Sequence, residues 1–393
     1  MDCVPPRPSR KQAPLRLAIF SGVYDYILDG IALTLNRLVE QLEADGVEVL
    51  VFAPTAKTAA FPHAGTLVSV PSFAIPGRSE YRCATGLGRT ARQRLETFQP
   101  NLFHIAVPDI LGLNALCLAR RQKIPVIASY HTRYETYPSY YGMGMVRPLL
   151  AGYLRRFYAS ADRVCAPSPS MAAEIEAAGY GRDIHVWGRG VKPQRFNPQK
   201  RSLEWRRGLG IGDDELILLF VSRLVREKGL DTFADVVDGL TNNGSKFRCV
   251  VVGDGPDRAS LEKRLPQAVF TGFLGGDDLP RAYASSDVFF FASLTETFGN
   301  VTLEAMASGL PVVCADATGS RSLVDPDVTG FLGAPEDTAA FVNQLERLLS
   351  DENLRHSMGA AGLDRSAEYT QERAYRQLRS VYDSLLTPAD ADA

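Results

Sequence analysis

The sequence predicts two doubly wound α/β domains, each built on a parallel β-sheet, that face each other across a cleft. Three observations favour this fold class. The chain has 393 residues, which suits two domains of about 200 residues each. Short apolar strands alternate with amphipathic helices along both halves. Apolar residues make up 45% of the chain and charged residues 22%, which is typical of a globular protein.

The first half opens with the predicted strand Leu15–Phe20, followed by the loop 21–30 and the amphipathic helix Ile31–Ala44. The further predicted strands are Val47–Ala53, Leu102–Ile105, Val126–Tyr130, Val164–Pro167 and His185–Trp187, and the further helices are Gly88–Phe98, Leu111–Gln122, Met145–Ala159 and Met171–Ala178. Strands and helices that alternate in this way form a parallel sheet with right-handed crossovers.

The same alternation starts again after residue 212. The predicted strands are Leu216–Val221, Arg248–Gly253, Val269–Thr271, Val288–Ala292 and Pro311–Ala315, and the helices are Leu230–Leu240, Arg258–Arg264, Leu279–Ala284 and Asn300–Ser308. Two facing sheets of this kind place strand ends and helix N-termini around one cleft, which suits an anionic nucleotide. Dehydrogenases, epimerases and binding proteins share this layout, so the motifs must decide.

The domain boundaries follow from composition. Residues 1–14 are rich in Pro and basic residues and are predicted to be a disordered leader, and 387–393 a frayed tail. The first domain is predicted to span 15–195 and the second 213–370. Residues 196–212 lack periodicity and are predicted to be the linker. The helix 371–386 completes either domain, and a return to the first domain is one of the two arrangements.

Cysteine usage and hydropathy indicate a cytoplasmic protein. The six cysteines form no CxxC pair, which argues against a metal ribbon or a disulfide scaffold. No apolar run approaches the roughly 18 residues that span a bilayer, and the stretch near Leu17–Phe20 is too short for a signal peptide. Any membrane contact is therefore expected to be peripheral.

The two halves differ in charge. Residues 1–200 hold 24 Lys and Arg against 15 Asp and Glu, whereas residues 201–393 hold 19 against 30. Two interpretations stay open: the basic half meets an anionic partner such as a phospholipid surface or a phosphorylated acceptor, or the asymmetry reflects chance and solvated helix faces. No nucleic acid partner is expected.

Two glutamates eight positions apart bracket a glycine-containing turn. Glu296 precedes the turn, and Glu304 lies about one turn inside the helix that follows. The turn presents the backbone N–H groups of Phe298, Gly299 and Asn300, which suit a phosphate or sugar oxygen. Carboxylates accept hydrogen bonds from paired hydroxyl groups, so both glutamates suit a sugar or a ribose. The alternative is that both only stabilise the helix dipole.

Two cations, Arg223 and Lys228, lie where a predicted strand ends and a helix follows, in the segment Val-Ser-Arg-Leu-Val-Arg-Glu-Lys-Gly at 221–229. Both are placed to reach a pyrophosphate at the carboxyl edge of the sheet and to neutralise a departing diphosphate. A basic loop in solvent is the alternative.

A histidine, His131, directly follows a predicted strand in the segment Ser-Tyr-His-Thr-Arg-Tyr at 129–134. A lone histidine is usually structural, and His104 is interpreted in that way. Because His131 sits where the strands open onto the cleft, we assign it a positioning and electrostatic role.

A glycine, Gly30, opens the first helix after the loop 20–29. A helix start with a glycine lets a phosphate or a sugar approach the backbone. A flexible turn between strand and helix is the alternative.

Together these segments resemble retaining glycosyltransferase family four, whose two Rossmann-like domains form the GT-B fold. The resemblance rests on a Glu-x7-Glu signature at 296–304, an Arg-x4-Lys-Gly element at 223–229, a His-Thr pair at 131–132 and the glycine loop 20–35, and it covers nearly the whole folded chain. The loop is most similar to that of lipid-directed mannosyl-, glucosyl- and sulfoquinovosyltransferases.

The resemblance implies a role for each residue at a matching position. Glu296 contacts the donor sugar and Glu304 the ribose. Arg223 and Lys228 hold the donor diphosphate, and His131 lies beside the transferred sugar.

Four further positions match the family less closely or only through the backbone. Gly30 belongs to the donor site, but Asp29 stands where Asn or Gly is usual. Phe273 corresponds to the edge that binds the base, mostly through backbone atoms. Lys192 replaces an Asp near the hinge.

The activity implied is transfer of a hexose, of the mannose or glucose type, from a GDP- or UDP-sugar to a lipid or glycan acceptor with retained α configuration. In this family the acceptor attacks on the face from which the diphosphate leaves. The only cofactor-like molecule is the nucleotide sugar itself, because the fold type needs no metal. The Asp-Pro-Asp sequence at 325–327 is interpreted as a proline turn rather than a metal site. Donor, acceptor and oligomeric state stay open.

The helix 145–158 has two interpretations. With its arginines near headgroups and its Leu, Tyr and Phe side chains facing inward, it lies on an anionic membrane, which places the protein at the inner face of the cytoplasmic membrane. Alternatively, it packs on its own sheet.

Two other function classes stay open. A nucleotide-sugar epimerase or hydrolase of related architecture turns the sugar over without an acceptor. A non-catalytic binding module keeps donor affinity but shows no turnover.

Overall fold

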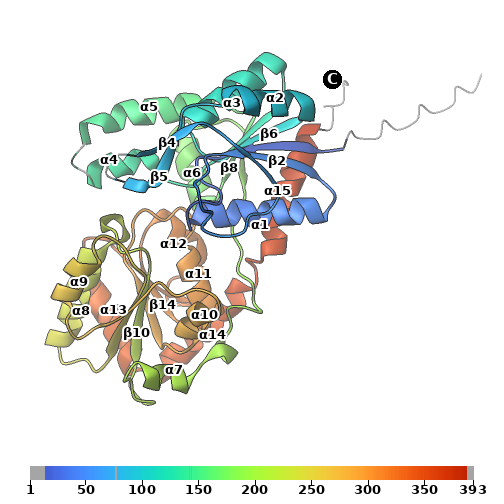
Figure 1. Ribbon diagram of the computed structural model, residues 1–393. Coiled ribbons are helices and arrows are strands. Elements are labelled where there is room, and N and C mark those ends of the chain that lie inside the picture. Colours follow the sequence, from blue (N-terminus) through green and yellow to red (C-terminus); the bar gives the residue numbers. More distant parts are fainter. Residues whose placement is uncertain (1–13, 76–77, 141, 143, 387–393) are drawn as a thin grey trace, which may run out of the picture.

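The chain forms two domains, each built on a parallel sheet, in a computed structural model that describes residues 14–75, 78–140, 142 and 144–386 (Figure 1). The first sheet has the strand order β3-β2-β1-β6-β7-β8-β9 and the second β12-β11-β10-β13-β14-β15. Every strand pair in both sheets is parallel. The predicted fold class, two doubly wound domains, is confirmed. The predicted leader 1–14, apart from Pro14, and the tail 387–393 lie outside the described residues.

The first domain surrounds its sheet with helices. Its strands are β1 (Arg16–Phe20), β2 (Glu48–Ala53), β3 (Thr66–Ser69), β6 (Leu102–Ile105), β7 (Val126–Ser129), β8 (Arg163–Ala166) and β9 (Ile184–Val186). Its helices are α1 (Gly30–Ala44), α2 (Gly88–Phe98), α3 (Ile110–Gln122), α4 (Tyr137–Tyr140), α5 (Arg147–Tyr158) and α6 (Pro169–Ala177), with 3-10 turns η1 (Tyr134–Thr136) and η2 (Gly144–Val146). An antiparallel hairpin of β4 (Ser72–Ile75) and β5 (Arg78–Ala84) stands apart from the sheet.

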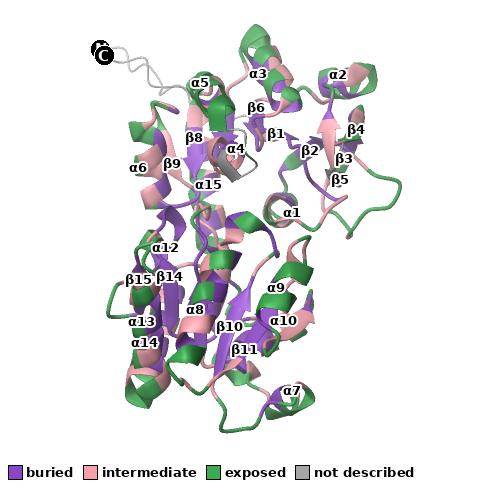
Figure 2. Ribbon diagram, turned by 90° about the vertical axis from the view of Figure 1, so that its left-hand side faces the viewer, coloured by how far each residue is buried: buried purple, intermediate pink, exposed green. Residues whose placement is uncertain are grey.

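The second domain follows the same plan. Its strands are β10 (Ile217–Val221), β11 (Arg248–Val252), β12 (Val269–Gly272), β13 (Val288–Phe291), β14 (Val312–Ala315) and β15 (Gly330–Gly333). Its helices are α8 (Leu230–Asn242), α9 (Arg258–Arg264), α10 (Asp278–Ala284), α11 (Asn300–Ala307), α12 (Thr318–Leu323), α13 (Thr338–Ser350) and α14 (Glu352–Ser366), with the 3-10 turn η4 (Arg226–Lys228). Figure 2 shows the buried strands at the centre of each domain and the exposed helix faces outside.

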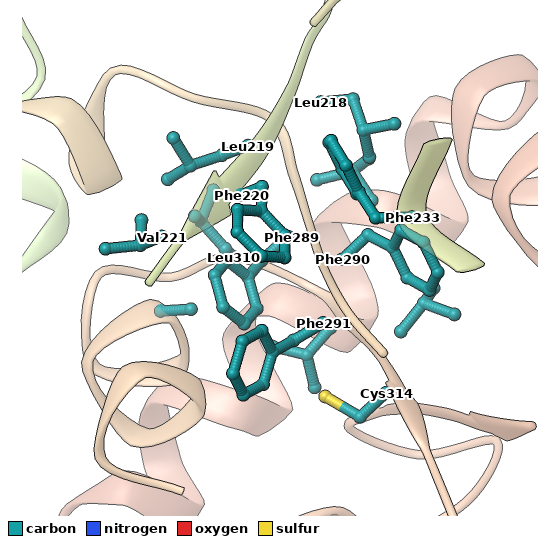
Figure 3. Packing of buried hydrophobic residues seen from close by; sticks show 14 of the residues in the cluster. Leu218, Leu219, Phe220, Val221, Phe233, Phe289, Phe290, Phe291, Leu310 and Cys314 are labelled. Atoms are coloured by element: carbon teal, nitrogen blue, oxygen red, sulfur yellow. The ribbon is translucent and has the colours of Figure 1, made fainter. Parts of the chain in front are cut away.

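The core of the second domain is one continuous cluster rich in phenylalanine (Figure 3). Phe220 on β10 packs against Phe233 on α8 with ring centroids 4.5 Å apart. Phe289 and Phe291 on β13 also contact one another, at 6.0 Å. Aromatic side chains bury large areas, so this cluster holds the sheet and the loops at its carboxyl edge in place.

The last helix, α15 (Gln371–Leu386), returns to the first domain. Its Leu378, Val381 and Tyr382 complete a core cluster that lies on one face of the first sheet. The Tyr382 hydroxyl lies 2.5 Å from His104 Nδ1, and His104 Nε2 lies 2.6 Å from the Ser129 hydroxyl. Burial lowers the pKa of His104 to about 3, so this histidine is neutral and structural.

The segment 196–212, predicted as a linker, belongs structurally to the second domain. It contains the 3-10 turn η3 (Pro198–Lys200) and the helix α7 (Leu203–Gly208). Arg206 is fully buried and donates to the Ser285 carbonyl at 2.8 Å and to Asp287 at 3.1 Å. A helix of this length spans too few turns to show a period, and its buried anchor is an arginine, so the hydropathy pattern did not reveal it.

The chain crosses between the domains at two adjacent places. Val191 pairs with Thr370 in an isolated bridge, and its N–H donates to the Tyr369 carbonyl at 2.9 Å. A Cβ on Gly190 would lie 2.2 Å from the Thr370 carbonyl carbon. Only glycine fits there, because backbone rather than a flexible side chain is the neighbour.

Several elements were not predicted. β3 and β4 have four residues each, and the seven residues of β5 are mainly polar, so no long apolar run marks these strands. α12 and β15 are also short. α13 does show helical spacing in its buried Phe341, Val342, Leu345 and Leu348, and this pattern was overlooked. Predicted strand ends otherwise differ from the observed ones by only one or two residues.

Candidate active site

A turn between β13 and α11 places Glu296 at the carboxyl edge of the second sheet. Gly299 precedes α11 with φ +95, a conformation that favours glycine, and no side chain caps the helix. The first N–H groups of α11 therefore point outward from the helix N-terminus. Gly319 on α12 lies directly behind this turn, where a Cβ would come within 2.9 Å of the Glu296 carbonyl oxygen.

The loop after β10 carries the two predicted cations. The ammonium group of Lys228 forms a short ion pair with Glu296 Oε1, and each side chain is 18% exposed. Gly229 ends η4 with φ +72, which turns the chain sharply into α8. Arg223 reaches across to the first domain, where its Nη1 donates to the Tyr81 hydroxyl at 2.8 Å.

The first domain contributes His131 from the end of β7. Its side chain is 8% exposed, and its Nδ1 lies 2.6 Å from Nη2 of Arg189. Its ring meets Trp187 edge-on, with centroids 5.6 Å apart. Burial, together with the neighbouring charge of Arg189, lowers the pKa of His131 well below 6.5, so the ring is neutral at physiological pH.

The loop before α1 brings Gly30 to the same region. Asp29 caps α1 by accepting a hydrogen bond from the Ile31 N–H at 2.7 Å. The substitution of the usual Asn or Gly by Asp29 thus places a carboxylate on one of the amides that was expected to be available to a phosphate. Gly30 itself is exposed, and a Cβ there would meet open space.

These residues line one cavity of about 300 Å³ between the two domains. Of the predicted site residues, the cavity brings together Gly30, His131, Arg223, Lys228, Phe273, Glu296, Phe298, Gly299 and Asn300. Phe298 contributes mainly backbone, because its side chain is 4% exposed and packs on Tyr369 in the core. Phe273 is 67% exposed at the rim.

Glu304 is the one predicted site residue outside the lining of this cavity. It lies one turn further along α11 and accepts a hydrogen bond from the Tyr283 hydroxyl at 3.1 Å. Burial raises its pKa to about 7, while Tyr283, Arg195 and Arg37 act in the opposite direction. Because Arg37 comes from α1, Glu304 lies beside the boundary between the domains.

Direct hydrogen bonds join the two domains around the cavity. The Thr297 hydroxyl donates to the His131 carbonyl at 2.9 Å, and the Ser168 hydroxyl donates to the Thr297 carbonyl at 2.9 Å. Arg133 donates to the Thr318 hydroxyl at 2.9 Å and pairs with Glu174 at 3.1 Å. Thr297, the residue after Glu296, is therefore hydrogen-bonded to the backbone of His131.

The lining residues that sequence reasoning missed include Arg189, Thr297 and Tyr137. Arg189 and Thr297 lie inside segments that resemble the family, but neither pattern singles out their side chains. Tyr137 follows the His-Thr pair by only a few residues, and nothing in its neighbourhood marks it.

The Asp-Pro-Asp sequence at 325–327 lies in a turn away from the cavity. Asp325 pairs with Arg365 at 2.8 Å, and Asp327 has φ +63. Within the described residues, no group of three or more His, Cys, Asp and Glu side chains is arranged to hold a metal ion.

The helix α5 packs on its own domain. Leu154, Phe157 and Tyr158, which the membrane interpretation turned toward lipid, are buried in the first domain, so that part of the interpretation is wrong. The exposed apolar side chains are instead those before and at the start of the helix: Met145 is 94% exposed and Leu149 77%. No helix among the described residues is both long and apolar enough to cross a membrane.

Two family models match the chain. Residues 28–195 match the family described as Glycosyltransferase Family 4, and residues 202–365 match Glycosyl transferases group 1. The two matches correspond to the two domains.

Curated relatives cover most of the chain. A GDP-mannose-dependent alpha-mannosyltransferase of Mycobacterium tuberculosis is 38% identical over 81% of this chain and 83% of its own length. The sulfoquinovosyl transferase SQD2 of Arabidopsis thaliana is 32% identical over 95% of this chain and 74% of its own. An alpha-monoglucosyldiacylglycerol synthase of Streptococcus pneumoniae is 29% identical over 92% of this chain and 85% of its own.

Solved structures share the fold at lower sequence identity. A sucrose-phosphate synthase from Thermosynechococcus elongatus superimposes with a TM-score of 0.79 at 21% identity, covering 94% of this chain and 99% of that one. Anabaena HepE, solved with UDP and glucose, gives a TM-score of 0.74 at 19% identity, covering 94% and 100%.

Proposed function

This chain is a glycosyltransferase that belongs to glycosyltransferase family 4, and we propose that it moves a hexose from a nucleotide diphosphate sugar to a lipid or glycan acceptor with retention of the α configuration. One observation carries the proposal. A single cavity faces Arg223, Lys228, Glu296 and an uncapped helix N-terminus from one domain toward His131 from the other.

The donor diphosphate binds to the second domain. Arg223 and Lys228 both line the cavity from the loop after β10, and the N–H groups at the start of α11 add a partial positive charge. Lys228 now pairs with Glu296, so a bound diphosphate competes with that carboxylate for the ammonium group. The ribose reaches Glu304 one turn along α11, and the base stacks or lies near Phe273 at the rim.

The sugar lies between Glu296 and His131. Glu296 accepts hydrogen bonds from sugar hydroxyls and orients the ring. The neutral imidazole of His131 donates one hydrogen bond to a sugar oxygen without bringing a positive charge to the reacting carbon.

Transfer then proceeds on one face of the sugar. The bond between the anomeric carbon and the diphosphate oxygen breaks, and the acceptor oxygen forms a bond to that carbon from the same side. The acceptor hydroxyl gives its proton to the leaving phosphate oxygen. Catalysis consists of positioning and of stabilising the departing charge by Arg223, Lys228 and the helix amides, and we propose that no metal ion is required.

A donor panel tests the proposal. Purified protein is incubated with GDP-mannose, UDP-glucose and related nucleotide sugars plus a lipid extract, and products are identified by mass spectrometry. We expect an acceptor that carries one added hexose. This product should form either with GDP-sugars or with UDP-sugars, but not with both. The names of the mannosyltransferase relatives make GDP-mannose the first donor to test. Release of free sugar without a glycosylated product would indicate a hydrolase, and donor binding without turnover would indicate a binding module.

The acceptor is proposed to be a membrane lipid. Relatives named as a sulfoquinovosyl transferase and a monoglucosyldiacylglycerol synthase support this acceptor class. The exposed Met145, Val146 and Leu149 stand beside Arg147, so apolar and cationic groups occur together at the start of α5. We propose that this edge contacts an anionic membrane at the cytoplasmic face.

A vesicle experiment tests the membrane contact. The protein should sediment with vesicles that contain anionic phospholipid at low salt and stay in the supernatant with vesicles of neutral phosphatidylcholine. Equal behaviour with both compositions would contradict the contact but leave the transfer reaction itself untouched.

A further inference from the structure

The guanidinium group of Arg189 is held against His131 in the wall of the cavity. Its Nη1 donates to the Trp187 carbonyl at 3.1 Å and to the Gly188 carbonyl at 3.3 Å, and its Nη2 lies 2.6 Å from His131 Nδ1. The group also lies 4.6 Å above the Trp187 ring. Its hydrogen-bond partners among the described residues are thus two carbonyls and an imidazole, without a carboxylate.

This contact decides which imidazole nitrogen carries the proton. Arginine only donates hydrogen bonds, so His131 Nδ1 must accept. A neutral imidazole with an accepting Nδ1 carries its proton on Nε2, and an imidazolium would set two donors against each other. Nε2 is buried and has no hydrogen-bond partner within the described part of the chain, while His131 lines the cavity. An N–H group at this place is available to a bound sugar.

Burial and the charge of Arg189 keep His131 neutral. Arg189 from the crossover and His104 from β6 are the titratable groups beside the ring, and His104 is itself neutral. Across the cavity stand Asp29, Glu296, Arg223 and Lys228, none of which forms a hydrogen bond with the ring. Burial lowers the pKa of Arg189 to about 10, which leaves the guanidinium protonated at neutral pH.

We propose that Arg189 is a positioning residue for sugar transfer: it fixes His131 as the neutral Nε2–H tautomer, aimed at an acceptor oxygen of the donor sugar. This inference rests on the proposed function, in which the imidazole of His131 donates a hydrogen bond to the donor sugar. With the proton on Nε2, His131 cannot accept a proton at that atom. Its protonation state also does not change over the physiological pH range.

The place of Arg189 in the chain supports this role. It stands between Gly188 and Gly190, immediately before the crossover at Val191. Gly190 packs against Thr370 backbone with no room for a side chain. The base of the Arg189 side chain is therefore held by rigid backbone contacts, and its far end holds the imidazole.

The direct test is the protonation state of His131. The chain contains five histidines, so ¹⁵N-labelled histidine gives few signals, and a His131→Gln variant identifies the one sought. In the full-length protein we expect the Nε2–H tautomer without titration between pH 5 and 8. In Arg189→Gln the pKa of His131 should rise, because one of the causes that lower it is removed. Arg189→Lys keeps a cationic donor and should retain the low value.

A matched control comes from Arg133, a second arginine near His131 that pairs with Glu174 instead of the imidazole. Arg133→Gln should leave the tautomer and its pH independence unchanged. An Arg189→Gln protein that is folded by circular dichroism, yet shows the same His131 tautomer and titration as the parent, overturns the proposal.

Kinetics supply the second readout. Arg189→Gln should lower kcat on the order of 10- to 100-fold, because a misplaced catalytic contact costs about that much, with a smaller change in KM. In a His131→Ala background the same substitution should have little further effect, since Arg189 acts through the imidazole. Full additivity of the two losses overturns the proposal. If the parent protein transfers no sugar, the proposed function fails, while the tautomer measurement still decides this inference.

Discussion

The two domains differ in how their cores are built and in which elements they bring to the cavity. The second domain rests on one continuous aromatic core, and its Lys228 and Glu296 pair with each other on adjacent loops of the same sheet. The first domain splits its core into two clusters on opposite faces of its sheet, one of them closed by α15, and its hairpin reaches the cavity residue Arg223 through the Tyr81 hydroxyl. Under the proposed function, the contrast places the diphosphate, which is the constant part of the substrate, on the domain with the continuous core, and the variable acceptor on the first domain.

The largest expected effect is therefore in the second domain. Glu296→Gln removes the negative partner of Lys228 and the acceptor for sugar hydroxyls. We expect kcat to fall on the order of 10²- to 10³-fold, the loss typical of a preorganised contact in the transition state. Initial rates with saturating donor measure the effect.

Glu204→Gln is the matched control for this substitution, because it makes the same chemical change on an exposed face of α7. Its rate should equal that of the parent. If Glu296→Gln retained more than about a tenth of the activity, the claim that the second domain provides the largest contribution to the rate would be wrong.

The next prediction compares two residues, one from each domain, that share a hydrogen bond. Arg223→Ala removes a charge-assisted contact to the diphosphate, worth roughly 1.5–3 kcal/mol in donor affinity. Tyr81→Phe removes only the hydroxyl that accepts from Arg223 at 2.8 Å, and should change donor affinity by about 1 kcal/mol or less. Calorimetric titration with the nucleoside diphosphate measures both. Equal losses would show that the hairpin, not the second domain alone, holds the diphosphate.

Glu304 offers a pH-dependent comparison, because its pKa is raised from 4.5 to about 7 in the folded chain. A carboxyl group with a raised pKa binds its proton more tightly when folded, so its contribution to stability is complete below pH 4.5 and is lost as the pH rises through 7. Relative to Glu304→Gln, the unliganded parent should lose stability between pH 5 and 8 in thermal unfolding.

Nucleotide binding should show the opposite trend at the same residue. The ionised carboxylate accepts hydrogen bonds from both ribose hydroxyls, so affinity should rise from pH 6 to pH 8 in the parent and stay flat in Glu304→Gln. A parallel rise in both proteins would assign the pH dependence to another group, such as the phosphate.

The smallest effect is expected at the surface of the first domain. Leu149→Ser removes one exposed apolar side chain at the start of α5 without opening the core. We expect a several-fold loss of vesicle binding, because a fully inserted leucine contributes about 1.5–3 kcal/mol and a partly inserted one less. Activity on a detergent-solubilised acceptor should not change. Leu203→Ser, at an exposed leucine on α7 in the second domain, is the control.

The sequence was most informative where function restricts the residues. The turn at 296–304, the cations at 223 and 228 and His131 form recognisable patterns, and all but Glu304 line one cavity. The longer helices α2 and α15 were predicted with the observed ends, because their apolar spacing extends over full turns.

The unpredicted features depend on contacts between distant segments. The hairpin β4–β5 is exposed and has no apolar run, and α7 is held by the buried Arg206, a residue type that hydropathy assigns to the surface. Arg189 became visible as a partner of His131 only when the fold brought the two residues together across 58 positions of sequence. The membrane interpretation of α5 was wrong for its buried residues, because the sequence alone does not show which apolar side chains of a helix face the core.

The anomeric configuration of the first product tests the central claim most directly. With an α-linked nucleotide sugar as donor, proton NMR of the glycosylated product at early reaction times should show the α anomer together with one equivalent of nucleoside diphosphate. A β-linked first product would contradict transfer on a single face of the sugar within the cavity between the two domains.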